Sequence, residues 1–262
     1  MRINSQMPNN SLIRSPYFIL FAPIVTLVFL TISSCTPIAI NETAYDYSLA
    51  EDKLNALPKT LILAPRNIGI PSKNYLQRYE QKIDDAVIER LTQNGYRVIQ
   101  SDVFEAAWRQ AERKFGSPYN SSLSQINANA FKRIMHYVFD ELQKSHDAEA
   151  ILFTDLLEQL IVFSGSNNRR AKWHGVSRAP KIRGGNQLPA SFDWSQTIPA
   201  VSLRVIIYSL DGNLLFKSFG GLEVSRQLNA DKARFVRRDK LFTSNKNVTE
   251  GVAIALHPFI PL

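Results

Sequence analysis

The amino-acid sequence predicts an α/β fold in which a mixed sheet is packed with helices in a single domain. Two observations support this class. Short apolar segments alternate along the chain with longer segments whose apolar residues recur every fourth position, the spacing of one helix face. Residues 200–210 instead alternate with a period of two, and Asp211-Gly212 directly after them is a hairpin signal.

The first half of the domain alternates strands with helices. Residues 60–64 are apolar after Thr60 and predict a buried strand that ends at Pro65. A helix is expected over residues 74–94, with Gly95 just beyond its end, and a second strand over residues 96–100. Asp102 and Glu105 have capping-box spacing, which predicts a second helix running to about residue 114.

The second half continues with a third helix over about residues 126–144 and a strand over residues 148–154, whose pairing is expected to continue toward residue 163. Residues 200–210 and 214–219 form the two strands of the hairpin. A closing helix is expected around residues 248–256, stopped by Pro258.

Residues 1–34 differ in composition from the rest of the chain. Their only charges are Arg2 and Arg14, and an uncharged apolar stretch runs from Tyr17 to Ile32. At about 1.5 Å per residue, this stretch is marginal for crossing a hydrocarbon core about 30 Å thick. A basic flank, a short apolar run and small residues after it are the parts of a secretory signal.

The segment Ile32-Ser33-Ser34-Cys35 resembles the bacterial lipobox, an aliphatic residue and two small residues before a cysteine. The resemblance implies cleavage between Ser34 and Cys35, and attachment to Cys35 of a diacylglycerol and a further acyl chain such as palmitate. Cys35 is the only cysteine of the chain, so it cannot form an internal disulfide. Several buried acyl chains would hold the protein firmly to a membrane.

Two alternatives to lipidation stay open: an uncleaved single-span anchor and a plain cleaved signal. Charges around the apolar stretch place the amino terminus in the cytoplasm in every case. Thr36 stands where lipoproteins retained in the inner membrane usually have aspartate, so the resemblance implies the periplasmic side of the outer membrane. The inner membrane remains the alternative.

The chain therefore divides into three expected parts: a lipoprotein signal peptide (residues 1–34), a lipid-anchored tether (35–58) and an α/β envelope domain (59–262). Pro37 and the scarcity of periodic apolar positions indicate the tether. The formal net charge of the chain is +8, and removing the signal with its two arginines leaves +6.

The order of elements over roughly residues 60–220 resembles a group of envelope lipoproteins and periplasmic domains. The segments that carry the resemblance are Gly95-Tyr96-Arg97-Val98-Ile99, Ala148-Glu149-Ala150-Ile151-Leu152-Phe153 and the hairpin from Tyr208 to Phe216. The group includes the curli-secretion lipoprotein and the amino-terminal domain of the Tol-system β-propeller protein. It implies a role in envelope assembly and supplies no catalytic residue.

Catalytic and metal-binding patterns are not found in the sequence. His136, His146, His174 and His257 have no metal-ligand spacing, and no Cys-x-x-Cys pair exists, so neither a metal nor a cofactor is expected. Ser164 and Ser166 lack the first glycine of a Gly-x-Ser-x-Gly elbow. The carboxylate pairs Asp84-Asp85 and Asp140-Glu141 are expected on solvated helix faces.

A basic segment at about residues 164–199 is the clearest candidate binding feature. It is expected to be a long polar loop, and its cations have no acidic neighbour before Asp193. The candidate residues for binding an anionic partner are Arg169, Arg170, Lys172, Arg178, Lys181 and Arg183. A second basic cluster follows the hairpin and comprises Arg226, Lys232, Arg234, Arg237, Arg238 and Lys240.

Anionic lipid, lipopolysaccharide or an acidic envelope protein would each suit these cations, and a solvated loop with incidental charge is the alternative. Export argues against nucleic acid as the partner.

The functional hypothesis is a non-enzymatic envelope lipoprotein, an accessory or scaffold subunit in assembly or secretion, whose oligomeric state is open. The alternatives are a hydrolase of envelope polymers, built from Ser or Asp with His136 or His174, and a secretion-pore subunit.

Overall fold

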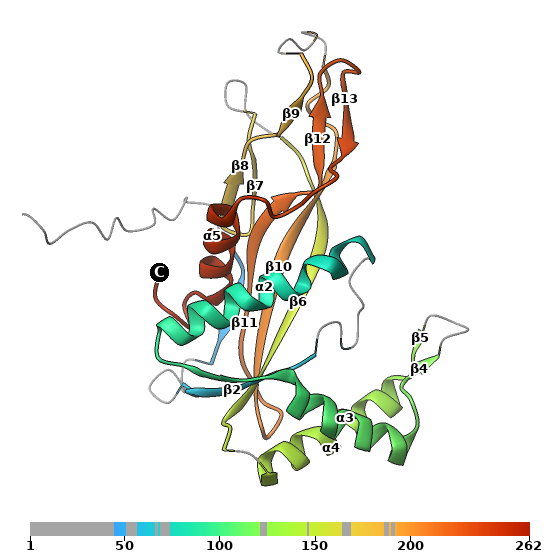
Figure 1. The fold of residues 1–262 in the computed structure, drawn as a ribbon, viewed down its shortest axis with the longest axis vertical. Coiled ribbons are helices and arrows are strands. Elements are labelled where there is room, and N and C mark those ends of the chain that lie inside the picture. The colour runs from blue at the N-terminus through green and yellow to red at the C-terminus, as the bar shows by residue number, and fades with distance from the viewer. Residues whose placement is uncertain are drawn as a thin grey trace, which may run out of the picture. The chain divides into compact units, whose positions relative to one another are not determined.

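The computed structural model describes residues 45–50, 57–65, 68, 74–120, 125–145, 147–163, 169–185, 189 and 192–262. Residues 40–262 form one compact unit. The signal, Cys35 and most of the expected tether lie outside the described residues. The expected α/β class is confirmed, because a mixed sheet carries helices on both faces (Figure 1).

The central sheet has six strands in the order β1-β11-β10-β6-β2-β3. β2 pairs in parallel with β3 and β6, and the other neighbours are antiparallel. Its strands are β1 (Tyr47–Leu49), β2 (Thr60–Leu63), β3 (Arg97–Ile99), β6 (Ala150–Ile161), β10 (Ile198–Ser209) and β11 (Leu214–Val224). The described helices are α2 (Asn74–Gln93), α3 (Ser101–Phe115), α4 (Ala128–Ser145) and α5 (Asn245–Leu256).

Strand β2 shows how the sheet separates two cores. Leu61 and Leu63 point into the core formed with α2 and α5, whereas Ile62 between them points into the core formed with α3 and α4. Successive side chains of a strand face opposite sides, and β2 is apolar on both because helices cover both. A third core lies where the ends of β6 and β10 meet β7 and β8, and it includes Ile161 and Ile198.

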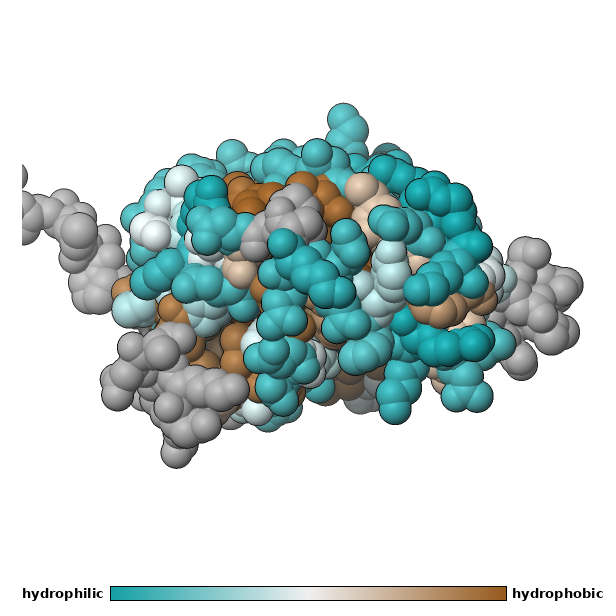
Figure 2. Space-filling model, turned by 90° about the horizontal axis from the view of Figure 1, so that it is seen from below, coloured by the Kyte–Doolittle hydropathy of each residue, from teal (hydrophilic) through white to brown (hydrophobic). Residues whose placement is uncertain are grey.

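Short strands form three smaller sheets. β4 (Tyr119–Asn120) pairs with β5 (Gln125–Ile126), and β7 (Ala171–Trp173) pairs with β8 (Val176–Arg178). The third has the order β13-β12-β9 and consists of β9 (Ile182–Arg183), β12 (Arg226–Asn229) and β13 (Arg234–Arg237). Within the compact unit, this sheet lies at the end opposite α3 and α4 (Figure 1). Seen from the α3–α4 end, the surface is mainly hydrophilic, with smaller apolar areas between the polar side chains (Figure 2).

The predicted hairpin is confirmed. The amide of Gly212 donates to the carbonyl of Ser209 over 2.9 Å, and Gly212 has φ +78°, which an L side chain would strain. The return strand β11 is longer than expected and continues to Val224. Its extension contains Gly220 and Gly221.

Two local expectations are corrected. Residues 47–49, expected in the tether, form the edge strand β1 on β11, because three residues can pair without the long alternation that reveals a strand. Helix α3 begins at Ser101 and is preceded by Gln100, whose side chain makes no capping bond, so Asp102 and Glu105 do not form a capping box. Asp102 lies within the first turn, where its charge still favours the helix dipole.

Asp84, expected on a solvated helix face, is instead only 3 % exposed and accepts a hydrogen bond from Thr154 Oγ1 over 2.8 Å. Among the described residues, no helix has both the length and the apolar character needed to cross a membrane.

Glycine lets helix α5 approach β11 closely. A Cβ on Gly220 would lie 1.9 Å from the carbonyl oxygen of Gly251, and one on Gly251 would lie 2.5 Å from the carbonyl oxygen of Gly221. These neighbours are backbone atoms and cannot rotate away. The packing of α5 on the sheet therefore requires glycine at both positions.

We predict that Gly220→Ala lowers the free energy of unfolding by at least about 3 kcal/mol, the upper range for overpacking, because α5 must move off the sheet. Urea denaturation would measure this. Gly185→Ala is the matched control, since its Cβ would meet only Asp231 Oδ1 at 3.5 Å, and we expect a change below about 0.5 kcal/mol. Equal stability of the two variants would contradict the close contact.

Candidate anionic-partner surface

The basic segment at residues 164–199 is not a single polar loop. It contains β7, β8 and β9, and Ala171, Trp173 and Val176 are buried in the third core. Each strand has only two or three residues, too few for alternation to be recognised in the sequence. Gly175, at the turn between β7 and β8, has φ +78° and permits the reversal.

The six candidate cations fall into two groups. Arg170, Arg178 and Lys181 bind groups of this chain, and Arg170 donates to Ser177 Oγ over 2.7 Å and to the Ser177 carbonyl over 2.6 Å. The side chains of Arg169, Lys172 and Arg183 are exposed, and Lys181 belongs to both groups because 46 % of its side chain is exposed. Arg169 lies over the ring of Trp194, 4.4 Å from its centroid, a cation–π contact.

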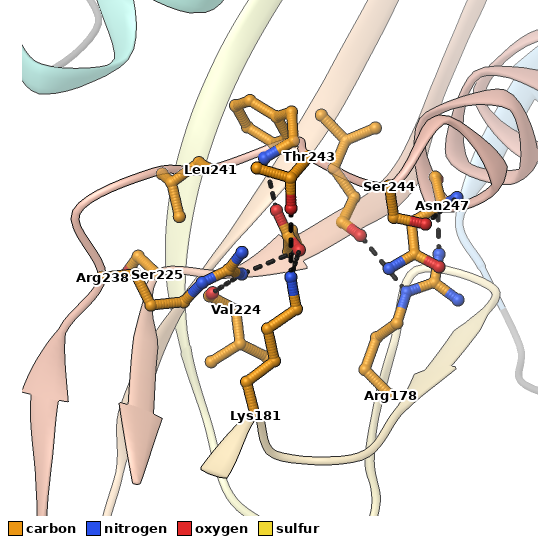
Figure 3. Close-up of polar contacts among 12 residues, drawn as sticks. Arg178, Lys181, Val224, Ser225, Arg238, Leu241, Thr243, Ser244 and Asn247 are labelled. Carbon is orange, nitrogen blue, oxygen red and sulfur yellow. Dashed lines mark hydrogen bonds and ion pairs between the residues drawn. The ribbon is translucent and has the colours of Figure 1, made fainter. Parts of the chain in front are cut away.

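Arg178 is a correction to the predicted partner surface, because it is only 9 % exposed. Its Nη1 lies 2.7 Å from Glu250 Oε2 on α5. Its Nε donates to the carbonyl of Leu222 on β11 over 3.2 Å (Figure 3). A buried guanidinium needs such partners, since an unpaired buried charge is costly. Arg178 therefore ties β8 to β11 and α5 and presents no free charge to a partner.

Glu223 on β11 is the anion at the centre of the adjoining cluster. It is 3 % exposed, and its Oε1 lies 2.8 Å from Arg238 Nη1 and 3.1 Å from Lys181 Nζ. These are ion-pair contacts without hydrogen-bond geometry at Oε1. Its other oxygen, Oε2, accepts from the amide of Phe242 (Figure 3). One carboxylate thus binds three segments: the one after β8, the one after β13 and the one before α5.

Cavities at the polar clusters are small. One of about 30 Å³ is lined by Arg178, Lys181, Glu223, Arg226 and Arg238, together with Ala179, Val224 and Asn247. Another of about 10 Å³ lies beneath α2, beside Asp84 and Asp155. These volumes hold about one water molecule, whereas pockets for small-molecule ligands measure roughly 300–1,000 Å³. The basic residues therefore line a surface here and not a ligand pocket.

The two basic clusters of the sequence meet in one sheet. β9 pairs in parallel with β12, placing Ile182 beside Leu228 and Arg183 beside Asn229, and β12 pairs with β13. We call the resulting end of the domain the basic tip and define it as residues 160–163, 169, 181–185, 192–194 and 226–237. Its exposed cations are Arg169, Lys181, Arg183, Arg226, Lys232, Arg234 and Arg237; its exposed acids are Asp193 and Asp231.

An aromatic cluster supports the basic tip from within. Phe235 on β13 stacks on Phe163 with their ring centroids 5.7 Å apart and their planes 8° apart. Phe192 and Trp194 complete the cluster, with centroids 5.7 Å and 6.4 Å from that of Phe235. Leu228, opposite Phe235 in the strand pairing, is fully buried. The exposed cations therefore project from a well-packed core.

Sequence reasoning missed the exposed aliphatic residues of the basic tip. Leu160 is 69 % exposed, Ile182 is 55 % exposed and Val162 is 42 % exposed. Ile182 lies between Lys181 and Arg183, an isolated aliphatic residue within a basic run, which was the available signal. Leu160 and Val162 stood in a continuous apolar run, in which the solvent-facing positions cannot be told from the buried ones.

His174 and Ser202 are the one histidine–serine pair that matches the hydrolase alternative among the described residues. His174 Nδ1 lies 2.8 Å from Ser202 Oγ, which also accepts from Trp173 Nε1 over 3.2 Å. Burial lowers the pKa of His174, which suits a neutral ring accepting the serine proton. Ser202, however, is only 1 % exposed, so its hydroxyl is closed to a substrate.

The remaining histidines are far from such a pair. His136 is exposed on α4 and lies 3.8 Å from Asp140, its neighbour one turn along. His257 contacts the hydroxyl of Tyr45. In the described part of the chain, no three His, Cys, Asp or Glu side chains come together as a metal site. His146, Ser164 and Ser166 lie outside the described residues.

Comparison with known proteins provides no relative: no family model, no curated protein and no solved structure matches the chain. The geometry of the basic tip and the sequence of the amino-terminal segment therefore carry the functional argument.

We predict that Glu223→Gln lowers the free energy of unfolding by about 3–5 kcal/mol, because it leaves the buried Arg238 without its countercharge. Glutamine can still accept from the Phe242 amide, so the change isolates the charge. Asp239→Asn is the control: its ion pair with Arg183 spans 3.7 Å at the surface, and its loss should cost less than about 1 kcal/mol. Similar urea midpoints for both variants would contradict a structural role for Glu223.

We also predict a contribution of His174 to the pH dependence of stability. Burial lowers its pKa below the ordinary value of 6.5 in the folded state. Below that pH the unfolded chain therefore binds more protons than the folded chain. The contribution of His174 to stability is fully present above the unfolded pKa, and it is lost as the pH drops through the folded pKa. Between about pH 7.5 and pH 5, wild type should lose more stability than His174→Gln; parallel losses in urea denaturation would refute this.

Proposed function

We propose that this chain is a lipid-anchored, non-enzymatic protein of the bacterial envelope that acts as an accessory or scaffold subunit and binds an anionic partner through its basic tip. The observation that carries the proposal is the lipobox-like segment at residues 32–35, whose first residue, Ile32, is also the last residue of the apolar stretch. We place the protein on the periplasmic side of the outer membrane, with the inner membrane as the alternative.

The described domain supports a role in binding. Seven exposed cations and two exposed acids occupy the basic tip, and the aromatic cluster beneath them keeps the surface in place. Such an excess of one charge attracts anionic partners over several ångströms and weakens as salt is added. Arg169, Lys181 and Arg183, three of the predicted partner residues, remain part of this surface.

The hydrolase alternative receives less support than its residues first indicate. A nucleophilic serine must reach a substrate carbonyl, and Ser202 lies under Trp173 and His174 with almost no exposed surface. The pair is better explained as a satisfied polar contact between β10 and the turn after β7.

The pore-subunit alternative is not supported by β7 either. A membrane-inserted strand would need an apolar outer face, but Lys172 at the centre of β7 is exposed and the residues on either side of it are buried.

The decisive experiment compares wild type with Cys35→Ala by intact mass and membrane partition. We expect the wild type to start at an acylated Cys35 and to partition with membranes, and the variant to lack the added lipid mass. Ser33→Ala is the matched control, since it keeps a small residue and should be processed normally. A wild-type chain that retains residues 1–34 and carries no lipid would make it a single-span protein and refute the proposal.

A further inference from the structure

We infer that the basic tip is a second membrane contact, which docks on an anionic lipid surface by inserting exposed aliphatic side chains among headgroups that its arginines and lysines bind. The inference deepens the proposed function, because it names the anionic partner of that surface. It rests on the placement of aliphatic and cationic side chains around β12.

The strand pairings place the aliphatic residues at one end of the domain. Leu160 pairs with Pro199, whose carbonyl accepts from the amide of Ser225, the residue before β12, over 3.0 Å. Ile182 pairs with Leu228 in the middle of β12. Leu160 therefore lies across β10 from the residue before β12, and Ile182 lies beside the centre of β12; both are more than half exposed.

Cations surround both aliphatic residues. Lys181 and Arg183 flank Ile182 in sequence, and Arg226 follows Ser225, which lies across β10 from Leu160. On β13, Arg237 pairs with Arg226 and Arg234 pairs with Asn229. Two arginines directly opposite each other repel, and this placement destabilises the free sheet unless an anion screens it. An anionic headgroup layer would relieve that repulsion.

The chemistry favours a lipid surface over an acidic protein. Single aliphatic side chains that project beside cations suit an interface in which the acyl boundary accepts the apolar group and phosphates accept the charge. A protein partner would need a shaped apolar recess for each projecting residue. The cavity of about 30 Å³ at the base of the tip is too small to receive a side chain from a partner in return. Trp194, with Arg169 over its ring, adds the kind of side chain enriched at membrane interfaces.

The test uses residues 40–262, which form a compact unit and lack Cys35, so lipidation cannot affect the result. Co-sedimentation would compare vesicles of phosphatidylcholine alone with vesicles that also contain phosphatidylglycerol. We expect binding only to the anionic vesicles and a loss of binding at high salt. Arg183→Glu with Arg234→Glu should weaken binding at least about tenfold, and Leu160→Gln with Ile182→Gln at least about fivefold.

A matched control carries the same charge change at the opposite end of the domain. Lys132 and Lys144 are exposed on α4, and Lys132→Glu with Lys144→Glu should leave vesicle binding within about twofold of wild type. All substituted residues are exposed, and urea denaturation would verify that each variant folds. A dye on Ile182→Cys, the only thiol of this unit, should shift its emission to shorter wavelength on anionic vesicles; a dye on Lys132→Cys should not.

Equal binding to both kinds of vesicle, or equal weakening by the control pair, would overturn the inference. So would binding to polyglutamate with no binding to vesicles, which would identify an acidic polypeptide as the partner. These outcomes leave the acylation of Cys35 untouched. Conversely, a wild-type chain without lipid would refute the proposed anchor while vesicle binding by the tip could still be observed.

Discussion

The ion pairs of the buried Glu223 carboxylate are the interaction on which the basic tip depends. Glu223 lies on β11, the second strand of the hairpin, and binds Arg238 after β13, Lys181 before β9 and the amide of Phe242 before α5. Because a buried ion is costly without its partners, these three segments are held in fixed positions relative to one another. The glycine contact between β11 and α5 depends on the same strand, so the position of the tip and the packing of the last helix are linked.

The sequence predicts the main elements of the fold and much less of the basic tip. The α/β class, the helices and the hairpin at Asp211-Gly212 could be predicted, because each leaves a local signal over many residues or at a specific turn. β1, β7 and β9 could not, because two or three residues show no period. β1 and β9 pair with β11 and β12, which lie far along the chain, whereas β7 pairs with the nearby β8.

The candidate surface shows a related limit. Net charge predicted a basic surface, but charge alone does not distinguish Arg178, which neutralises Glu250 inside the domain, from Arg183, which faces solvent. The distinction depends on acidic residues about 40 to 70 positions away, Glu223 and Glu250, which no local pattern connects to the segment. The pairing of β9 with β12, which are also far apart in the sequence, joins the two basic clusters into one sheet. The basic surface is therefore larger than either cluster alone suggested.

The anchor and the basic tip would act on membranes through different physics. Acyl chains on Cys35 would hold by the transfer of hydrocarbon out of water, which salt does not weaken. The tip would hold mainly by charge, within a screening length of about 8–10 Å at physiological ionic strength. A contact of the second kind can release while the first persists. The proposed pair of contacts would therefore let a permanently tethered domain change its orientation at the surface as local charge or salt changes, which a single lipid anchor cannot do.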